Sequence, residues 1–149
     1  MSNAPQNIIT SSDLRYTDNS NGTVTDNLTN LVWLKNANTF GLQTWEDALR
    51  LANSLESGAW GLTNGSIKGE WRMPSLSELE SLFDRSQFHP ALTAGHLFEN
   101  VQIDDDRYWS TNHFVDDTEY AWVAELEYGI SCIKLKTCPC CLLPVKARL

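Results

Sequence analysis

Two segments of the chain repeat apolar residues at the spacing of an α-helix. Thr44 can cap the first helix, with Asp47 three residues further on, and Ser57-Gly58 ends it. The apolar residues of this helix share one face, namely Trp45, Ala48, Leu49, Ala52 and Leu55. A second helix begins near Ser75, where Glu78 completes a capping box. Its buried stripe consists of Leu76, Leu79, Leu82 and Phe83.

Short segments on both sides of these helices have the composition of β-strands. Strands are predicted before the helices at residues 15–17, 23–25 and 31–34, with Asn21-Gly22 as a hairpin turn between the first two. After the helices, strands are predicted at 108–111, 120–128, 130–135 and 142–145. In 120–128 apolar and charged residues alternate with period two, and Gly129 is the predicted tip of the following hairpin. Strands, two helices and further strands predict an α+β domain with a mostly antiparallel sheet flanked by two helices.

Length and charge limit the classes of protein that fit. The chain has 149 residues, which suits a flexible N-terminal tail at 1–13 and a single domain at 14–149. A domain of that size buries enough surface to fold without a metal ion or a disulfide. The net charge of −8 disfavours nucleic acid as a partner, since phosphates are repelled by it. No apolar run is long enough for a membrane span, and no signal peptide is visible in this chain.

Tryptophans are frequent, and most of them fall in predicted elements. Core packing is therefore predicted for five of the six, which are Trp33, Trp45, Trp71, Trp109 and Trp122. Trp60 lies in a predicted loop, so the prediction of core packing does not extend to it and it could be exposed.

All four cysteines lie between Cys132 and Cys141. Four thiolates could hold zinc, but a zinc ribbon uses paired Cys-x-x-Cys units, and here Cys140 and Cys141 are adjacent. Adjacent residues of a strand point to opposite faces, so the spacing favours free or partly buried thiols that pack as small apolar groups. Zinc remains an alternative, and copper has less support.

Other chemistry has weaker signals, and no cofactor is predicted. The runs Asp104-Asp105-Asp106 and Asp116-Asp117 could bind calcium, although a solvated acidic loop is the favoured interpretation. The histidines His89, His96 and His113 are scattered, and no Gly-x-Ser-x-Gly motif is present. The sequence therefore predicts no catalytic residues.

A series of short motifs runs through the chain from about Arg15 to Lys146. They are Arg15-Tyr16-Thr17-Asp18-Asn19, Gly22-Thr23-Val24-Thr25-Asp26, Leu31-Val32-Trp33, Thr44-Trp45-Glu46-Asp47-Ala48, Glu70-Trp71-Arg72-Met73-Pro74, Glu78-Leu79, Tyr108-Trp109-Ser110-Thr111 and Tyr120-Ala121-Trp122. In this order the chain resembles the Lcl C-terminal domain of bacterial collagen-like proteins, a family of largely unknown function. The resemblance implies a C-type-lectin-like fold, of the variety shared with formylglycine-generating enzymes, and an extracellular or cell-surface location. In that fold the N- and C-terminal strands pair and two helices flank the sheet.

The chain departs from the family between Gly129 and Pro144. Family members often carry tyrosines and asparagines there, whereas this chain has Ile130, Ser131, Cys132, Ile133, Cys138, Pro139, Cys140 and Cys141. Unchanged length with exchanged side chains is typical of a surface under diversification. Some proteins with this fold are targets of diversity-generating retroelements, and we hypothesise that this chain is such a variable protein.

The predicted function is non-catalytic ligand binding on a C-type-lectin-like scaffold. The recognition surface would be the loop 112–114 and the hairpin around Gly129, continuing to Cys141. The candidate ligand-binding residues are Asn112, His113, Phe114, Tyr128, Ile130, Cys132, Lys134, Cys138 and Cys140. The expected partner is a protein or a surface glycan. Two alternatives stay open: a redox or metal-binding protein that uses the C-terminal cysteines, and an oligomerisation module, which the lack of a Gly-x-y repeat weakens.

Overall fold

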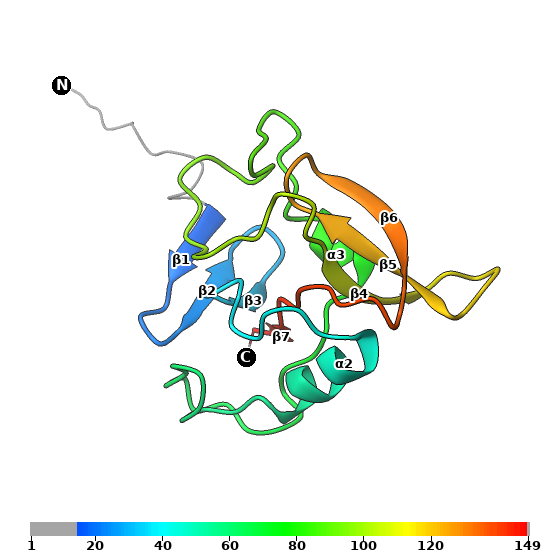
Figure 1. Ribbon diagram of the computed structural model, residues 1–149. Coiled ribbons are helices and arrows are strands. Elements are labelled where there is room, and N and C mark those ends of the chain that lie inside the picture. The colour runs from blue at the N-terminus through cyan, green and yellow to red at the C-terminus, as the bar shows by residue number, and fades with distance from the viewer. Residues whose placement is uncertain (1–14, 149) are drawn as a thin grey trace.

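Two antiparallel sheets form the body of the protein. In the computed structural model, which describes residues 15–148, the first sheet has the strand order β1-β2-β3-β7 and the second β4-β5-β6 (Figure 1). The predicted tail at 1–13 lies outside the described residues. The strands are β1 (Tyr16–Asp18), β2 (Thr23–Asp26), β3 (Leu31–Leu34), β4 (Tyr108–His113), β5 (Tyr120–Glu125), β6 (Ile130–Leu135) and β7 (Val145–Ala147). With two short helices, α2 (Trp45–Ser54) and α3 (Leu76–Glu80), this is an α+β domain, as predicted.

The two helices begin where the capping residues predict. The Thr44 side chain accepts a hydrogen bond from the Asp47 N–H, and Ser75 and Glu78 form the capping box of α3. Helix α3 ends at Glu80 and is therefore shorter than the apolar stripe suggests. Leu82, which lies beyond the end of the helix, is still fully buried. Helix α3 packs against β4 and β5, so it supports the second sheet.

The strand boundaries differ most from the prediction at β5 and at the last strand. Strand β5 ends at Glu125 and not at residue 128, because the Gly129 N–H returns to the Glu125 carbonyl and closes a turn. The last strand is Val145–Ala147 and not 142–145. It pairs with β3 and lies at the opposite edge of the sheet from β1, so the C-terminal strand joins the sheet of the N-terminal strands but does not pair with the first of them.

Aromatic side chains fill the interior. Trp33, Trp71 and Trp109 are fully buried, which confirms the prediction for these three. Trp45 is only partly buried against the core, and Trp122 is also half-buried, so the prediction of core positions is wrong in degree for both. Trp60 is 58 % exposed, as its loop position suggests.

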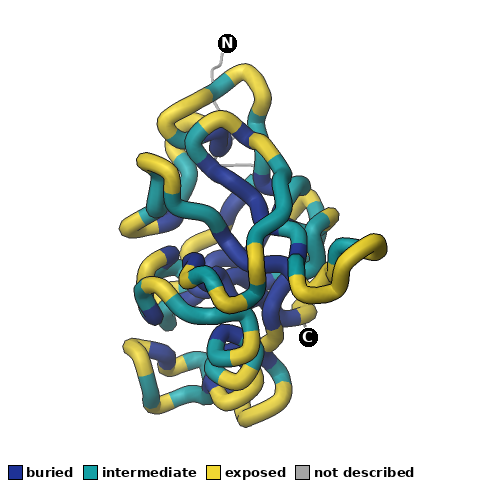
Figure 2. The backbone as a smooth tube through the Cα atoms, turned by 45° about the vertical axis from the view of Figure 1, so that its right-hand side comes forward, coloured by how far each residue is buried: buried dark blue, intermediate teal, exposed yellow. Residues whose placement is uncertain are grey.

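The segment 140–143 passes through the core and joins the two sheets. Cys140 exchanges two backbone hydrogen bonds with Gln43, while the Cys141 N–H donates to Arg107 and its carbonyl accepts from Trp109. All four residues of the segment are buried. Figure 2 shows buried backbone running through the middle of the molecule, with exposed backbone in the loops around it. Among residues 15–148, no helix has the length and apolar character that crossing a membrane requires.

Candidate ligand-binding site

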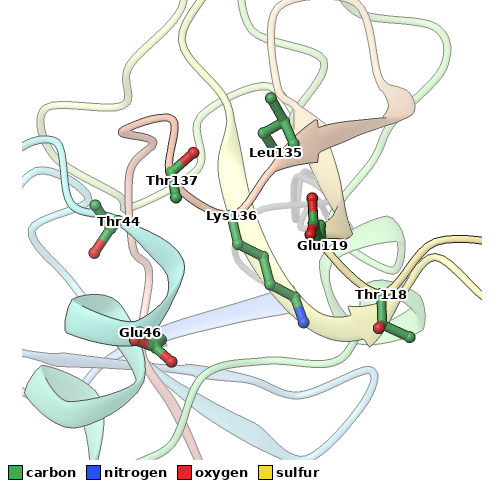
Figure 3. Close-up of a pocket in the computed structure, with 7 residues that line it drawn as sticks. All are labelled: Thr44, Glu46, Thr118, Glu119, Leu135, Lys136 and Thr137. Carbon is green, nitrogen blue, oxygen red and sulfur yellow. The ribbon is translucent and has the colours of Figure 1, made fainter.

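An open pocket of about 630 Å³ lies where three distant segments of the chain meet. Its lining residues come from the start of α2, the end of the β4–β5 loop and the end of β6, and are Thr44, Glu46, Thr118, Glu119, Leu135, Lys136 and Thr137 (Figure 3). The volume is in the range of pockets that take small ligands or one residue group of a larger partner. We call it the Lys136 pocket, because Lys136 lies between its two sides in Figure 3.

Backbone hydrogen bonds hold these segments together at Lys136. The Lys136 N–H donates to the Glu119 carbonyl at 2.9 Å, which extends the pairing between β5 and β6 by one step. The Lys136 carbonyl accepts from the Trp45 N–H at 3.0 Å, and Trp45 is the first residue of α2. Because the first N–H groups of a helix have no partner inside the helix, this bond fixes the start of α2 against the end of β6.

The Lys136 ammonium is held by an aromatic ring and an imidazole. Its Nζ lies 4.2 Å from the centre of the Trp45 ring and 2.6 Å from His113 Nδ1. An ammonium is only a donor, so His113 Nδ1 accepts and a neutral His113 carries its proton on Nε2. The Trp45 ring is itself fixed, because its Nε1–H donates to the Ser110 carbonyl at 2.9 Å. Trp45, His113 and Lys136 therefore form a pre-arranged cationic cluster beside the pocket.

The three candidates in the loop 112–114 have different surroundings. His113 belongs to the cluster just described. Asn112 is exposed, but its Oδ1 accepts from the Leu76 N–H at 2.8 Å and thereby caps α3. Phe114 is half-buried and packs edge-on against Trp122, with 6.1 Å between ring centres. Of the three, His113 is the one that the structure places beside the pocket.

Two further candidates lie at the opposite end of β6. Tyr128 is 51 % and Ile130 48 % exposed, at the tip of the hairpin. Tyr128 stacks on the exposed Phe88 with 6.4 Å between ring centres, and its ring lies 5.1 Å from that of His89. His89 in turn contacts the Glu127 carboxylate, 2.9 Å from Nδ1. The tip is thus an exposed aromatic cluster that is separated from the Lys136 pocket by the length of β6.

The remaining candidates lie on or under β6, and one of them is not on the surface. Cys132 and Lys134 are half-buried opposite Val123 and Ala121, and Cys138 is half-buried in the turn that follows. Cys140 is only 2 % exposed, so its inclusion in the recognition surface is wrong. The reason is its backbone pairing with Gln43, which draws it into the core. The predicted surface therefore ends before Cys140.

The two buried cysteines, Cys140 and Cys141, offer little reactive chemistry. All four are free, and burial raises the pKa of the Cys140 thiol to about 11 and that of Cys141 to about 12. Both are therefore protonated and shielded at neutral pH, which makes them poor nucleophiles and poor metal ligands. Within residues 15–148, no group of three or more His, Cys, Asp or Glu side chains is arranged to hold a metal ion.

Sequence reasoning missed most of the pocket. Lys136 was recognisable only as part of a local excess of basic residues after Glu127. Thr44 was recognisable as a helix cap, and nothing in the sequence indicates that residues 44–46 meet 118–119 and 135–137 in space. At the hairpin tip, Phe88 and His89 come from a loop that has no periodic pattern.

Comparison with known proteins supplies one match. The family model of the Lcl C-terminal domain matches residues 22–146, which is most of the chain and includes every residue that lines the Lys136 pocket. The curated proteins searched contain no match to this sequence.

Proposed function

The chain belongs to the Lcl C-terminal domain family, and we propose that it is a non-catalytic recognition domain that binds its ligand at the Lys136 pocket. The proposed partner is a protein or a glycan at a cell surface, and the proposed location of the domain is extracellular. The scaffold is proposed to be a C-type-lectin-like fold, which the antiparallel sheets, the two helices and the pairing of β3 with β7 support.

The observation that carries the proposal is the convergence of three segments on Lys136. The pocket offers three threonine hydroxyls, two carboxylates and one ammonium in a small volume. Such a set can donate to and accept from the hydroxyl and amide groups that glycans and peptides present. Since Trp45 and His113 already fix the ammonium, a ligand meets a cation whose position costs little further ordering.

The pocket also lies on a firm support. The Thr44 cap, the Trp45–Ser110 hydrogen bond and the pairing of β5 with β6 all anchor its walls to regular elements. Residues positioned by helices and strands keep their geometry better than those on free loops, and such positioning suits selective binding. The thiols of Cys140 and Cys141 lie in the core, where a substrate does not reach them. Their burial disfavours thiol-based catalysis and leaves binding as the better supported function.

We further propose that the positions open to diversification by a retroelement lie within residues 130–139, with Lys134 and Lys136 kept as framework. Ile130, Leu135 and Pro139 are exposed and the intervening residues, apart from the exposed Thr137, are half-buried. Exchange of exposed side chains usually changes stability by no more than about 0.5 kcal/mol. The fully buried residues 140–143 are excluded from this proposal, because exchange there would disturb the core.

The proposed binding is tested with the purified domain on a glycan array and a cell-surface protein array. We expect at least one ligand that wild type binds and that K136A binds at least about tenfold more weakly, since a charge-assisted contact contributes roughly 1.5–3 kcal/mol. The matched control is K68A, which removes an exposed lysine from the loop between α2 and α3. Ligands that K136A and K68A retain equally well would place recognition elsewhere.

The diversification proposal has its own test in the DNA next to the gene. We expect a near-copy of the 3′ coding end that differs at adenines, next to a reverse transcriptase gene. Its absence would remove the retroelement from the account and would leave binding at the Lys136 pocket unaffected.

A further inference from the structure

Strand β6 forms an unprotected edge of its sheet. The order β4-β5-β6 leaves one side of β6 without a neighbouring strand, and in Figure 1 β6 runs along the outer side of the sheet. Its sequence Ile-Ser-Cys-Ile-Lys-Leu contains no proline, and its pairing with β5 is regular over all six residues. Lys134 is its only charged residue. Edge strands usually carry prolines, bulges or several charges that prevent pairing with another chain, and β6 has few of these features.

The hydrogen bonds show which backbone groups face outward. In an antiparallel pair, alternate residues bond to the neighbouring strand. The Lys136 N–H donates to the Glu119 carbonyl, which places residues of even number on the side of β5. Ser131, Ile133 and Leu135 therefore direct their N–H groups away from the sheet. Within residues 15–148, no strand, bridge or hydrogen bond takes up these three N–H groups, while the Leu135 carbonyl accepts from Cys138.

We propose that the β6 edge pairs with β6 of a second copy of this chain, antiparallel, to make one continuous sheet across a two-fold dimer. This inference does not rest on the proposed ligand. Backbone complementarity permits a symmetric pairing centred on Ser131, Ile133 or Leu135, because each of these residues faces outward. Charge and the extent of the strand then decide among the three centres.

A centre at Leu135 would set Lys134 opposite Lys136 of the second copy, and like charges directly opposite each other destabilise a strand pair. A centre at Ser131 would pair Ile133 with Gly129 of the second copy, and Gly129 lies outside β6 in a left-handed turn conformation with φ of 75°. The centre at Ile133 avoids both conflicts. In it each Ile133 lies opposite the same residue of the other copy, and Lys134 lies opposite Cys132.

This pairing satisfies the free donors at the centre of the edge. The Ile133 N–H of each copy donates to the Ile133 carbonyl of the other, and the Leu135 N–H donates to the Ser131 carbonyl. The Ser131 N–H donates to the Leu135 carbonyl, which has a second lone pair for it besides the one that accepts from Cys138. The Ser131 hydroxyl donates to Glu80 Oε2 at 2.7 Å, so the Ser131 side chain already has a partner within its own copy. The Lys136 pocket shares only Leu135 with β6, and its other lining residues lie outside that strand.

Sedimentation and amide hydrogen exchange of the wild-type protein, from micromolar to millimolar concentration, test the proposal. We expect a monomer–dimer equilibrium. We also expect the amides of Ser131, Ile133 and Leu135 to become protected as the dimer forms. The amides of Cys132 and Lys134 bond to β5 and are expected to be protected at every concentration, which provides an internal control.

Two variants with the same change of charge locate the interface. I133K places a lysine opposite a lysine at the two-fold axis and is expected to raise the dimer dissociation constant roughly tenfold or more. V115K makes the same change at a loop residue that is 88 % exposed, and is expected to leave the dissociation constant within about twofold.

A monomer at every concentration overturns the proposal. So does a dimer in which Ser131, Ile133 and Leu135 stay unprotected, or one that I133K and V115K weaken equally. If I133K fails to fold, the exchange pattern of the wild type decides by itself.

Discussion

The contrast between Leu142 and Ile130 tests where the exchangeable surface ends. Both are aliphatic residues of the C-terminal segment, but Leu142 is 1 % exposed in the core and Ile130 is 48 % exposed on β6. Truncation of a buried leucine to alanine removes its transfer free energy and leaves a cavity, at a cost of about 2–5 kcal/mol. The same truncation at an exposed site usually changes the free energy of unfolding by no more than about 0.5 kcal/mol.

We therefore expect L142A to lower the free energy of unfolding by about 2–5 kcal/mol, and I130A to change it by no more than about 0.5 kcal/mol. Urea unfolding followed by tryptophan fluorescence and by circular dichroism measures both variants, and coincident transitions check two-state behaviour. In a chain of 149 residues, each kcal/mol corresponds to about 2–4 °C in the melting temperature. Equal and small effects of the two variants would refute the placement of residues 140–143 in the core.

Two further predictions concern ionisable groups. The thiols of Cys132 and Cys138 are expected to react with a thiol reagent much faster than those of Cys140 and Cys141, which are buried and have raised pKa values. All four thiols should react in denaturant. Fast reaction of all four in the native state would contradict the burial of Cys140 and Cys141. The Arg72 guanidinium donates two hydrogen bonds of 2.7 Å to the Glu78 carboxylate and thereby lowers the pKa of that carboxyl. Glu78 therefore contributes stability above its unfolded pKa, and this contribution is lost as the pH falls from about 5 through the lowered pKa. E78Q should lose less unfolding free energy than wild type over that pH range, and an unchanged pH dependence would refute the contribution.

The sequence predicted the helices and strands better than the contacts between distant segments of the chain. Capping residues and apolar periodicity located α2 and the start of α3, and the glycine at 129 located the β5–β6 hairpin. Local patterns carry that information because it depends on neighbours within a few positions. The end of β5 was missed because a turn closed by the Gly129 N–H and the Glu125 carbonyl interrupts the alternating pattern. The position of β7 was missed because its partner β3 lies far away in the chain.

The candidate site shows the same limit. Exposure was predicted well for Tyr128 and Ile130, which lie at a hairpin tip, where the turn itself forces residues outward. It was predicted wrongly for Cys140, because nothing in the local sequence indicates that Gln43 will pair with it. Lys136 gained its surroundings from Trp45 and His113, which lie 91 and 23 positions away in the sequence.

Hydrogen exchange of the whole domain, with and without a ligand from the arrays, tests the central claim most directly. The account predicts that added ligand protects amides clustered at residues 44–46, 112–119 and 135–137, and that K136A loses this protection. Protection confined to other surfaces, or turnover of the ligand in place of stable binding, would contradict it.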